Sequence, residues 1–305
     1  MSNWIDLLDP TDEEIRAHAP DLEPRLLDLF ARPADPVDGA RPFLRGFGSY
    51  VAGTVVAAVL EPERDRLYYQ QVDLIVTREH VVTIRKTPAG AEPYDPAAVR
   101  DICKQKQHVP PGKVVFYLFE DVAERYLDLL DGLDDEVDEL EENITSWPSQ
   151  RIRKRISELR HDLLHIRRTL SPTRDAVRGV VDGRVDIDAG LMRREIFPED
   201  VERSFSTVHE KLLRAAESLE YTRDLLAAAR DYHATEIATE QNDVIKRLTV
   251  VASLLLFPTF IVGLYGQNFR NMPELRWHFG YLFSWLLIIA VTLGQLAFFR
   301  WKKWI

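Results

Sequence analysis

The stretch LTVVASLLLFPTFIVGLY, residues 248–265, decides the fold because none of its 18 side chains is charged. A second uncharged stretch of 19 residues, YLFSWLLIIAVTLGQLAFF, follows at 281–299. As α-helices that rise about 1.5 Å per residue, the two would span roughly 27 to 29 Å, close to a bilayer core of about 30 Å. Both are apolar all round rather than along one stripe, which favours two membrane spans over two buried core helices.

Basic residues lie beside the spans on the side of both chain ends. The set comprises Lys246 and Arg247 before the first span and Arg300, Lys302 and Lys303 after the second. Of the Lys and Arg residues, only Arg270 and Arg276 stand in the connection between the spans. Positive side chains favour the cytoplasmic side, so the chain is predicted to be a multi-pass protein of the cell (inner) membrane, with both termini cytoplasmic and lipids as partners.

The charged part of the 305-residue chain narrows the class of protein. Its start, MSNWIDLLDPTDEE, is acidic and lacks an apolar core, which predicts no cleavable signal peptide. Cys103 is the only cysteine, which excludes an intrachain disulfide and fits a reducing compartment. The formal net charge of -10 argues against a nucleic-acid partner and favours cations.

Motifs of nucleotide binding and hydrolysis are missing from the sequence. It has no phosphate loop of the G-x-x-x-x-G-K type and no G-x-S-x-G elbow. We therefore expect a protein that is not an enzyme, that needs no cofactor and that is not driven by a nucleotide.

Local patterns predict a mixed α and β region in the first two-fifths of the chain. A helix is expected at DPTDEEIRAH, residues 9–18, with Thr11 as its cap and Glu14 at capping-box spacing. Runs rich in Val, Ile and Tyr predict strands at YVAGTVVAAV (50–59), LYYQQVDLIV (67–76), HVVTIRK (80–86) and VVFYLF (114–119). From Asp121 to about Val181 the pattern is helical, with a break at 147–149 that predicts a helical hairpin of one acidic and one basic arm, which can attract each other.

A long helix is predicted after this region. Neither proline nor glycine occurs between Pro198 and Pro258, and a helix over 199–257 would be about 90 Å long. We expect one unbroken helix from about 199 to 265 that serves as a stalk and enters the membrane. The predicted domains are a cytoplasmic α/β domain with helical hairpin at 1–198, a stalk helix at 199–247 and a transmembrane hairpin at 248–305.

One face of this predicted helix is small and polar. A heptad read back from the loop passes through Gly266, Gly263, Thr259, Leu256, Ala252, Thr249, Ile245 and Asn242. Small residues permit close helix packing in lipid, which is one explanation. The other is a conduit in a symmetric bundle, where Thr259 and Asn242 offer oxygens and Leu256 forms an apolar constriction. A two-helix hairpin cannot enclose a path, so the conduit requires several copies of the chain.

The connection between the two spans resembles that of a known family. YGQNF followed by MPELRW between two spans, with KKWI at the end, resembles the CorA family of divalent-cation channels of the two-span Gly-x-Asn type. The likeness extends to PTDEE (10–14), VDLIVTREHVVTIRK (72–86) and ELRHDLLHIRRTLSPTRDAV (158–177), so it covers the whole chain. It implies a CorA-like funnel-shaped homopentamer, in which an α+β cytoplasmic domain is joined by a long stalk helix to a two-helix transmembrane hairpin.

The resemblance also implies roles for single residues. Gly266, Gln267 and Asn268 would form the selectivity ring at the outer mouth, and the heptad residues from Asn242 to Gly263 would line the pore. Asp224 and Asp231 would lie in the cytoplasmic funnel, Asp231 near an acidic ring. Gln267 stands where the family usually has Met, and Arg270 stands where an acidic residue is common.

The function expected from the family is transport of divalent metal cations, foremost Mg2+ and also Co2+ or Ni2+, by a channel driven by the membrane potential. Gln267 keeps a second interpretation open, a zinc transporter of the same fold, with or without coupling to protons. A third belongs to another class: a non-conducting scaffold in which the hairpin anchors a cytosolic oligomer.

Two further groups could hold metal. Six carboxylates of the acidic arm could bind regulatory Mg2+, although such a run is more often a solvated helix face: Asp128, Asp131, Asp134, Asp135, Asp138 and Glu142. His161 and His165 have i, i+4 spacing on a predicted helix and could seat zinc. No third ligand stands beside this pair, so a surface pair is the favoured interpretation.

Overall fold

The computed structural model describes residues 3–33, 41–61, 66–87, 92–106, 108–185, 196–267 and 272–305. The chain forms two compact units, Met1–Ala229 and Arg230–Ile305. Helix α7, Glu199–Tyr265, contributes to both. The predicted fold class is confirmed: an α+β unit, a long helix and two apolar C-terminal helices. The predicted boundaries after residues 198 and 247 stay a prediction.

A five-stranded sheet forms the centre of the first unit, in the order β1-β5-β4-β3-β2. Its strands are β1 (Trp4–Leu8), β2 (Phe43–Phe47), β3 (Tyr50–Glu61), β4 (Arg66–Val76) and β5 (Val81–Arg85). β1 pairs parallel with β5, and the other pairs are antiparallel. The strands predicted near β3, β4 and β5 are confirmed, whereas the short edge strands β1 and β2 were not predicted.

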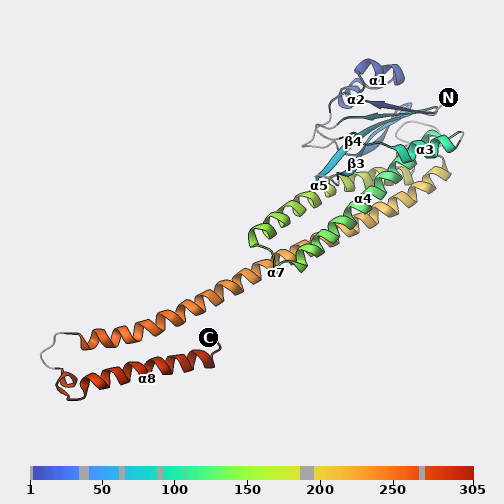
Figure 1. The fold of residues 1–305 in the computed structure, drawn as a ribbon. Coiled ribbons are helices and arrows are strands. Elements are labelled where there is room, and N and C mark those ends of the chain that lie inside the picture. Colours follow the sequence, from blue (N-terminus) through green and yellow to red (C-terminus); the bar gives the residue numbers. More distant parts are fainter. Residues whose placement is uncertain are drawn as a thin grey trace. The chain divides into compact units, whose positions relative to one another are not determined.

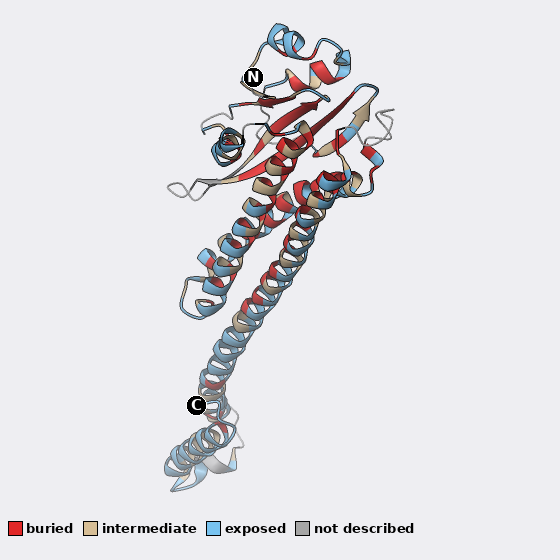
Figure 2. Ribbon diagram, turned by 90° about the vertical axis from the view of Figure 1, so that its right-hand side faces the viewer, coloured by how far each residue is buried: buried red, intermediate tan, exposed pale blue. Residues whose placement is uncertain are grey.

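Helices cover both faces of this sheet (Figures 1 and 2). Neighbouring residues of one strand point to opposite faces, so Leu74 packs in one core cluster and Ile75 in the other. The Ile75 cluster is covered by α1 (Asp12–His18) and α2 (Pro24–Phe30). The Leu74 cluster is covered by α4 (Pro111–Glu142), α5 (Ser149–Val181) and the start of α7. Because both faces are buried, β3 and β5 read as nearly continuous apolar runs, whereas β4 includes the polar residues Gln70, Gln71 and Asp73.

The capping box predicted at the start of α1 is confirmed. The Glu14 amide donates to the Thr11 hydroxyl, and the Thr11 amide donates to the Glu14 carboxylate at 2.8 Å. The box fixes where α1 begins, so that Ile15 enters the core under the sheet.

The helical hairpin is confirmed, but the strand predicted at 114–119 is wrong. That run lies inside α4, which begins at Pro111 and carries buried side chains on through Val122 and Tyr126. A short apolar run fits a buried strand and a buried helix equally well, and here the proline start and the helical burial pattern beyond it decide. The expected attraction between the arms is present in the ion pair of Arg155 with Glu136 at 2.6 Å.

Helix α7 is unbroken from Glu199 to Tyr265, as predicted. Its N-terminal part buries a stripe at three- and four-residue spacing that is apolar except for Thr222: Phe205, Val208, Leu212, Ala215, Leu219, Thr222, Leu226 and Ala229. Phe205 contacts Phe116 and Phe119 of α4 at ring-centroid distances of 5.8 and 6.0 Å. Packing on α4 therefore fixes which face of α7 remains free.

A buried ion pair joins three strands of the sheet. Asp73 of β4 lies 3.2 Å from the Lys86 ammonium, just past β5, and accepts a hydrogen bond from Thr54 of β3 at 2.6 Å. Burial raises the pKa of Asp73, against the opposing effect of Lys86. Removing either charge would leave the other buried without its counter-ion.

Candidate functional site: the exposed face of the long helix

Two helices of the second unit are long and apolar enough to cross a membrane, α7 and α8 (Gly280–Trp301). Within this chain only 11% and 6% of their most apolar windows are buried. A core helix of a soluble protein would be mostly buried, so this surface needs another apolar environment. Aromatic residues stand at both ends of α8, Trp277 against Phe283 and Trp301 beneath Lys302, as at membrane interfaces.

Helix α8 covers one side of the span in α7. Val250 and Ile261 are buried, and Ser253, Leu254 and Pro258 are half-buried between them. A hydrogen bond from the Gln295 amide to the Ser253 carbonyl, 3.3 Å long, joins the two helices on this side. Gln295 was not predicted as a site residue from the sequence, because it belongs neither to the loop motif nor to the heptad. The available signal was that it is the only amide side chain in an uncharged run of 19 residues.

The heptad residues lie on the side of α7 that α8 leaves free. Among the described residues, every predicted pore and funnel position is exposed, as is Gly266: Asp224, Asp231, Asn242, Ile245, Thr249, Ala252, Leu256, Thr259, Gly263 and Gly266. None of them is basic, and the two aspartates stand at the N-terminal end of the set. One face of α7 thus combines small size, polar oxygens and negative charge.

Threonine hydroxyls on this face have a defined orientation. Thr249 donates to the Ile245 carbonyl at 2.8 Å, and Thr259 donates to the Leu255 carbonyl at 2.7 Å. A hydroxyl whose hydrogen is used in this way keeps its lone pairs as acceptors. The face therefore offers acceptors, which suit a cation or the water molecules around it.

Two bulky apolar side chains interrupt the small residues. Ile245 is 59% exposed and Leu256 is 66% exposed. In a bundle with this face inward, rings of such side chains would form the narrowest dry segments. Leu256 stands in the middle of the span, between Ala252 and Thr259.

The loop motif is described only in part. Gly266 and Gln267 are exposed at the end of α7, and the Gly266 amide donates to the Val262 carbonyl at 2.9 Å. A Cβ atom at Gly266 would stand 3.1 Å from that carbonyl oxygen, so the position favours glycine. Asn268 and Arg270 lie outside the described residues.

The predicted funnel residues are exposed and lie beside arginines. Asp224 lies 3.8 Å from Arg223, and Asp231 accepts a hydrogen bond from Arg230 at 3.0 Å. Such surface pairs are worth little, so both carboxylates stay accessible to cations.

Within the described ranges, no cluster of three or more His, Cys, Asp or Glu side chains could hold a metal ion. Five of the six carboxylates on the acidic arm are exposed, and Asp134 is half-buried and accepts a hydrogen bond from Thr222 at 3.3 Å. This is the arrangement of a solvated helix face.

His161 and His165 do lie together, with ring centroids 4.4 Å apart. The His165 ring also stacks on Tyr69 of β4 at 5.6 Å. Burial, followed by the nearby charges of His161 and Arg168, lowers the pKa of His165. In the part of the chain that the structure describes, no third ligand completes a site.

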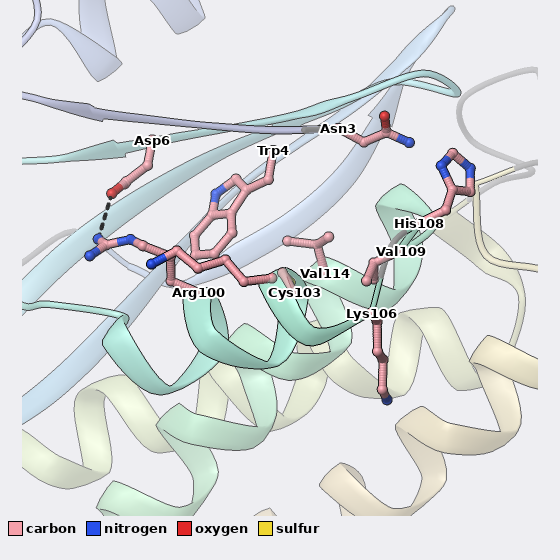
Figure 3. A pocket seen from close by; sticks show the side chains of 10 residues that line it. Asn3, Trp4, Asp6, Arg100, Cys103, Lys106, His108, Val109 and Val114 are labelled. Atoms are coloured by element: carbon pink, nitrogen blue, oxygen red, sulfur yellow. Dashed lines mark hydrogen bonds and ion pairs between the residues drawn. The ribbon is translucent and has the colours of Figure 1, made fainter. Parts of the chain in front are cut away.

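A separate pocket of about 510 Å³ lies between β1 and α3 (Ala97–Gln105) in the first unit (Figure 3). Its positive side chains have partners of their own. Arg100 pairs with Asp6 at 3.2 Å, and Lys106 points away and binds the Tyr117 hydroxyl at 2.6 Å. Both of these cations are thus already paired within the chain.

Comparisons with known proteins agree with these observations. The family model described as "CorA-like Mg2+ transporter protein" matches residues 2–303. The chain is 27% identical to the cobalt/magnesium transport protein CorA of Thermotoga maritima, over 87% of this chain and 73% of that protein. It is 24% identical to the magnesium transport protein CorA of Helicobacter pylori strain J99, over 80% of this chain and 74% of that protein.

Among solved structures, the complete CorA magnesium transporter of Methanocaldococcus jannaschii has the same fold. The two structures superpose with a TM-score of 0.78 at 18% identity, over 99% of this chain and 91% of that chain.

Proposed function

The chain belongs to the family of CorA-like Mg2+ transporter proteins, and from that premise we propose that it conducts divalent cations inward as a homopentameric channel. The cargo is Mg2+ first, with Co2+ and Ni2+ admitted. The observation that carries this proposal is the exposed face of α7, which is free of basic residues and opposite the side covered by α8.

A pore requires several copies because one hairpin cannot surround an ion. In a ring, the faces of α7 from Asn242 to Gly263 turn inward, and the α8 helices lie outside toward lipid. The arrangement hides the polar face from hydrocarbon, where unpaired polar groups are costly, and leaves the apolar surface in contact with lipid. Both termini are cytoplasmic in this proposal, so the Gly266 end of the span opens outside.

Ion choice follows from the chemistry of the face and the loop. Mg2+ binds oxygen in octahedral geometry and gives up water reluctantly, so a mouth that selects it holds the hydrated ion. Neutral acceptors such as the Asn268 amide and the Thr259 hydroxyl can accept hydrogen bonds from that water without trapping the ion. Gln267, a longer amide in place of the usual Met, is the position most apt to change which metals compete.

The membrane potential supplies the drive. A divalent ion that enters a cell gains roughly 4.6 kcal/mol per 100 mV, twice the value for a single charge. Inward transport therefore needs no coupled reaction. Asp231 and Asp224 on the same face of α7 would raise the local cation concentration where the ion leaves the span.

Flux into liposomes tests the proposal. The full-length chain is reconstituted, the potential is set with valinomycin and a K+ gradient, and entry of Mg2+, Co2+, Ni2+ and Zn2+ is followed with an indicator inside. We expect potential-dependent Mg2+ entry from an oligomer of five 35.2 kDa chains. Zn2+ entry that depends on a pH gradient would instead identify a zinc transporter. A well-folded oligomer with no metal flux would identify a scaffold.

A further inference from the structure

The span in α7 contains a proline that opens its hydrogen-bond ladder. Pro258 lies inside the helix and has no N–H, so the Leu254 carbonyl loses its helical donor, and the proline ring crowds that carbonyl. Side chains donate hydrogen bonds to the backbone carbonyls on both sides of Leu254. Thr259 donates to the Leu255 carbonyl at 2.7 Å, and Gln295 of α8 donates to the Ser253 carbonyl at 3.3 Å.

The two donors approach the break from different sides of the helix. Thr259 is on the exposed face together with Leu256, whereas Ser253 and Pro258 are half-buried on the side toward α8. Gln295 therefore holds the back of the weakened turn, away from the conducting face. Leu256 stands inside this turn, two residues before Pro258.

The Gln295 side chain is not explained by the stability of the hairpin. Its Oε1 atom is buried and has no hydrogen-bond partner among the described residues. An unpaired amide oxygen within a membrane span costs free energy, and a Met or Leu of similar size would avoid that cost. A polar side chain kept in a span despite its cost is a candidate for a functional role.

We propose that Gln295 is a positioning residue that ties the second span to the turn broken by Pro258, and thereby sets how far the Leu256 side chain reaches toward the pore axis. The inference rests on the proposed function. Prolines are the usual sites of helix kinks because the broken ladder bends easily. The Gln295 amide restrains this bend from behind, so movements of α8 are passed to the constriction.

Loss of the tie has a defined direction. Without the Gln295 donor, the weakened turn can relax away from α8, toward the face that carries Leu256, and the constriction narrows. We expect Gln295→Met to lower the potential-driven Mg2+ flux at least about fivefold, because one hydrogen bond of about 1 kcal/mol corresponds to that shift and the tie is lost in every subunit. Leu293→Met is the matched control, because Leu293 is on the same helix and 60% exposed.

A second background separates positioning from a general packing effect. In Pro258→Ala the Leu254 carbonyl regains an amide donor, so the turn no longer needs an external restraint. In that background Gln295→Met should change the Mg2+ flux less than about twofold. An equal fall in both backgrounds, or a flux that rises or is unchanged in Gln295→Met alone, would overturn the proposal.

Amide exchange gives a readout that does not depend on Pro258→Ala folding. In the full-length oligomer, peptides from the turn at 254–262 should exchange faster in Gln295→Met than in the parent or in Leu293→Met. Unchanged exchange would contradict the tie. A parent chain with no metal flux would contradict the proposed function, whereas a conducting parent without the coupling between positions 295 and 258 would contradict only this inference.

Discussion

The two units of this molecule use the same apolar side chains in opposite ways, within one helix. In Met1–Ala229, Phe205 of α7 is fully buried among the rings of Phe116, Phe119 and Phe197. In Arg230–Ile305, Leu255 of α7 is 65% exposed. Removal from water stabilises the first, at about 25 cal/mol per Å² of apolar surface, while lipid can take up the second. The same helix thus lies in two environments, so truncation of a buried side chain such as Phe205 should cost much stability and truncation of an exposed one such as Leu255 should cost little.

The largest expected effect is on folding. Phe205→Ala should lower the free energy of unfolding of the first unit by about 3–5 kcal/mol, because three aromatic neighbours would line the resulting cavity. Leu255→Ala should lower the free energy of unfolding of the second unit by less than about 0.5 kcal/mol. Thermal unfolding of the full-length protein in detergent, followed by circular dichroism, measures both.

Similar losses for the two substitutions would break the comparison. They would mean that Leu255 packs against protein rather than lipid, for example against a second copy of the chain. A concentration-dependent melting midpoint in Leu255→Ala would identify that case.

The next effect is on transport without a loss of folding. Asn268→Ala would delete one amide acceptor per subunit from the proposed ring at the mouth. One hydrogen bond of about 1 kcal/mol corresponds to roughly fivefold, and repetition around a ring multiplies the loss of Mg2+ flux and selectivity. Metal competition in liposomes measures it, with Gln267→Met as the matched change expected to keep transport and alter mainly the competing metals. Parental flux and selectivity in an assembled Asn268→Ala oligomer would reduce the loop to a connector.

A smaller effect is expected at the proposed constriction. Leu256→Ser places a hydroxyl on the exposed face. A ring of serine side chains at the constriction is hydrated more easily than a ring of leucines, so the resting Mg2+ leak should rise several-fold. The melting midpoint should stay near the parental value because Leu256 is 66% exposed. Leu255→Ser, one residue along and off the heptad, should leave the leak unchanged. A leak that rises equally in both would show a disturbed hairpin rather than a gate.

How much the sequence predicts differs between the two units for a physical reason. The span, the heptad face and the continuity of α7 follow from periodicity and from missing breakers, which are local properties. The strand predicted at 114–119 was wrong because a short apolar run is ambiguous, and only the burial of Tyr126 beyond it shows the helix. The edge strands β1 and β2 are five residues each and are defined by their partners, β5 and β3, rather than by a pattern of their own.

The candidate site shows the same limit. Exposure of Thr249, Leu256 and Thr259 agrees with the heptad, because α8 covers the other side of the span. The contact of Gln295 with Ser253 joins residues 42 positions apart, so no local pattern predicts it. The sequence shows Pro258 and therefore a missing hydrogen bond in the helix. It does not show which side chains donate to the carbonyls around that break, because this depends on the packing of α8.

The smallest expected effect concerns pH and separates the units through two histidines. His165 of the first unit has a lowered pKa because of burial, then of His161 and Arg168. The unfolded chain has a histidine pKa near about 6.5, so below that pH the unfolded state binds a proton that the folded state resists. Protonation of His165 therefore costs the folded state no stability above about pH 6.5. Below that pH, the free energy of unfolding declines as the pH falls toward the folded-state pKa of His165.

We accordingly expect the first unit to melt at a lower temperature at pH 5.5 than at pH 7.5, and His165→Phe to reduce that difference while keeping the stack on Tyr69. His278→Phe, an exposed position in the second unit, should leave it unchanged. The effect is small because the His165 ring is only half-buried, and water screens part of the charge. An unchanged pH difference in His165→Phe would show that other groups of the first unit bind the proton. A reduced difference in His278→Phe would show that the second unit also loses protein packing on acidification, which the comparison of the two units does not allow.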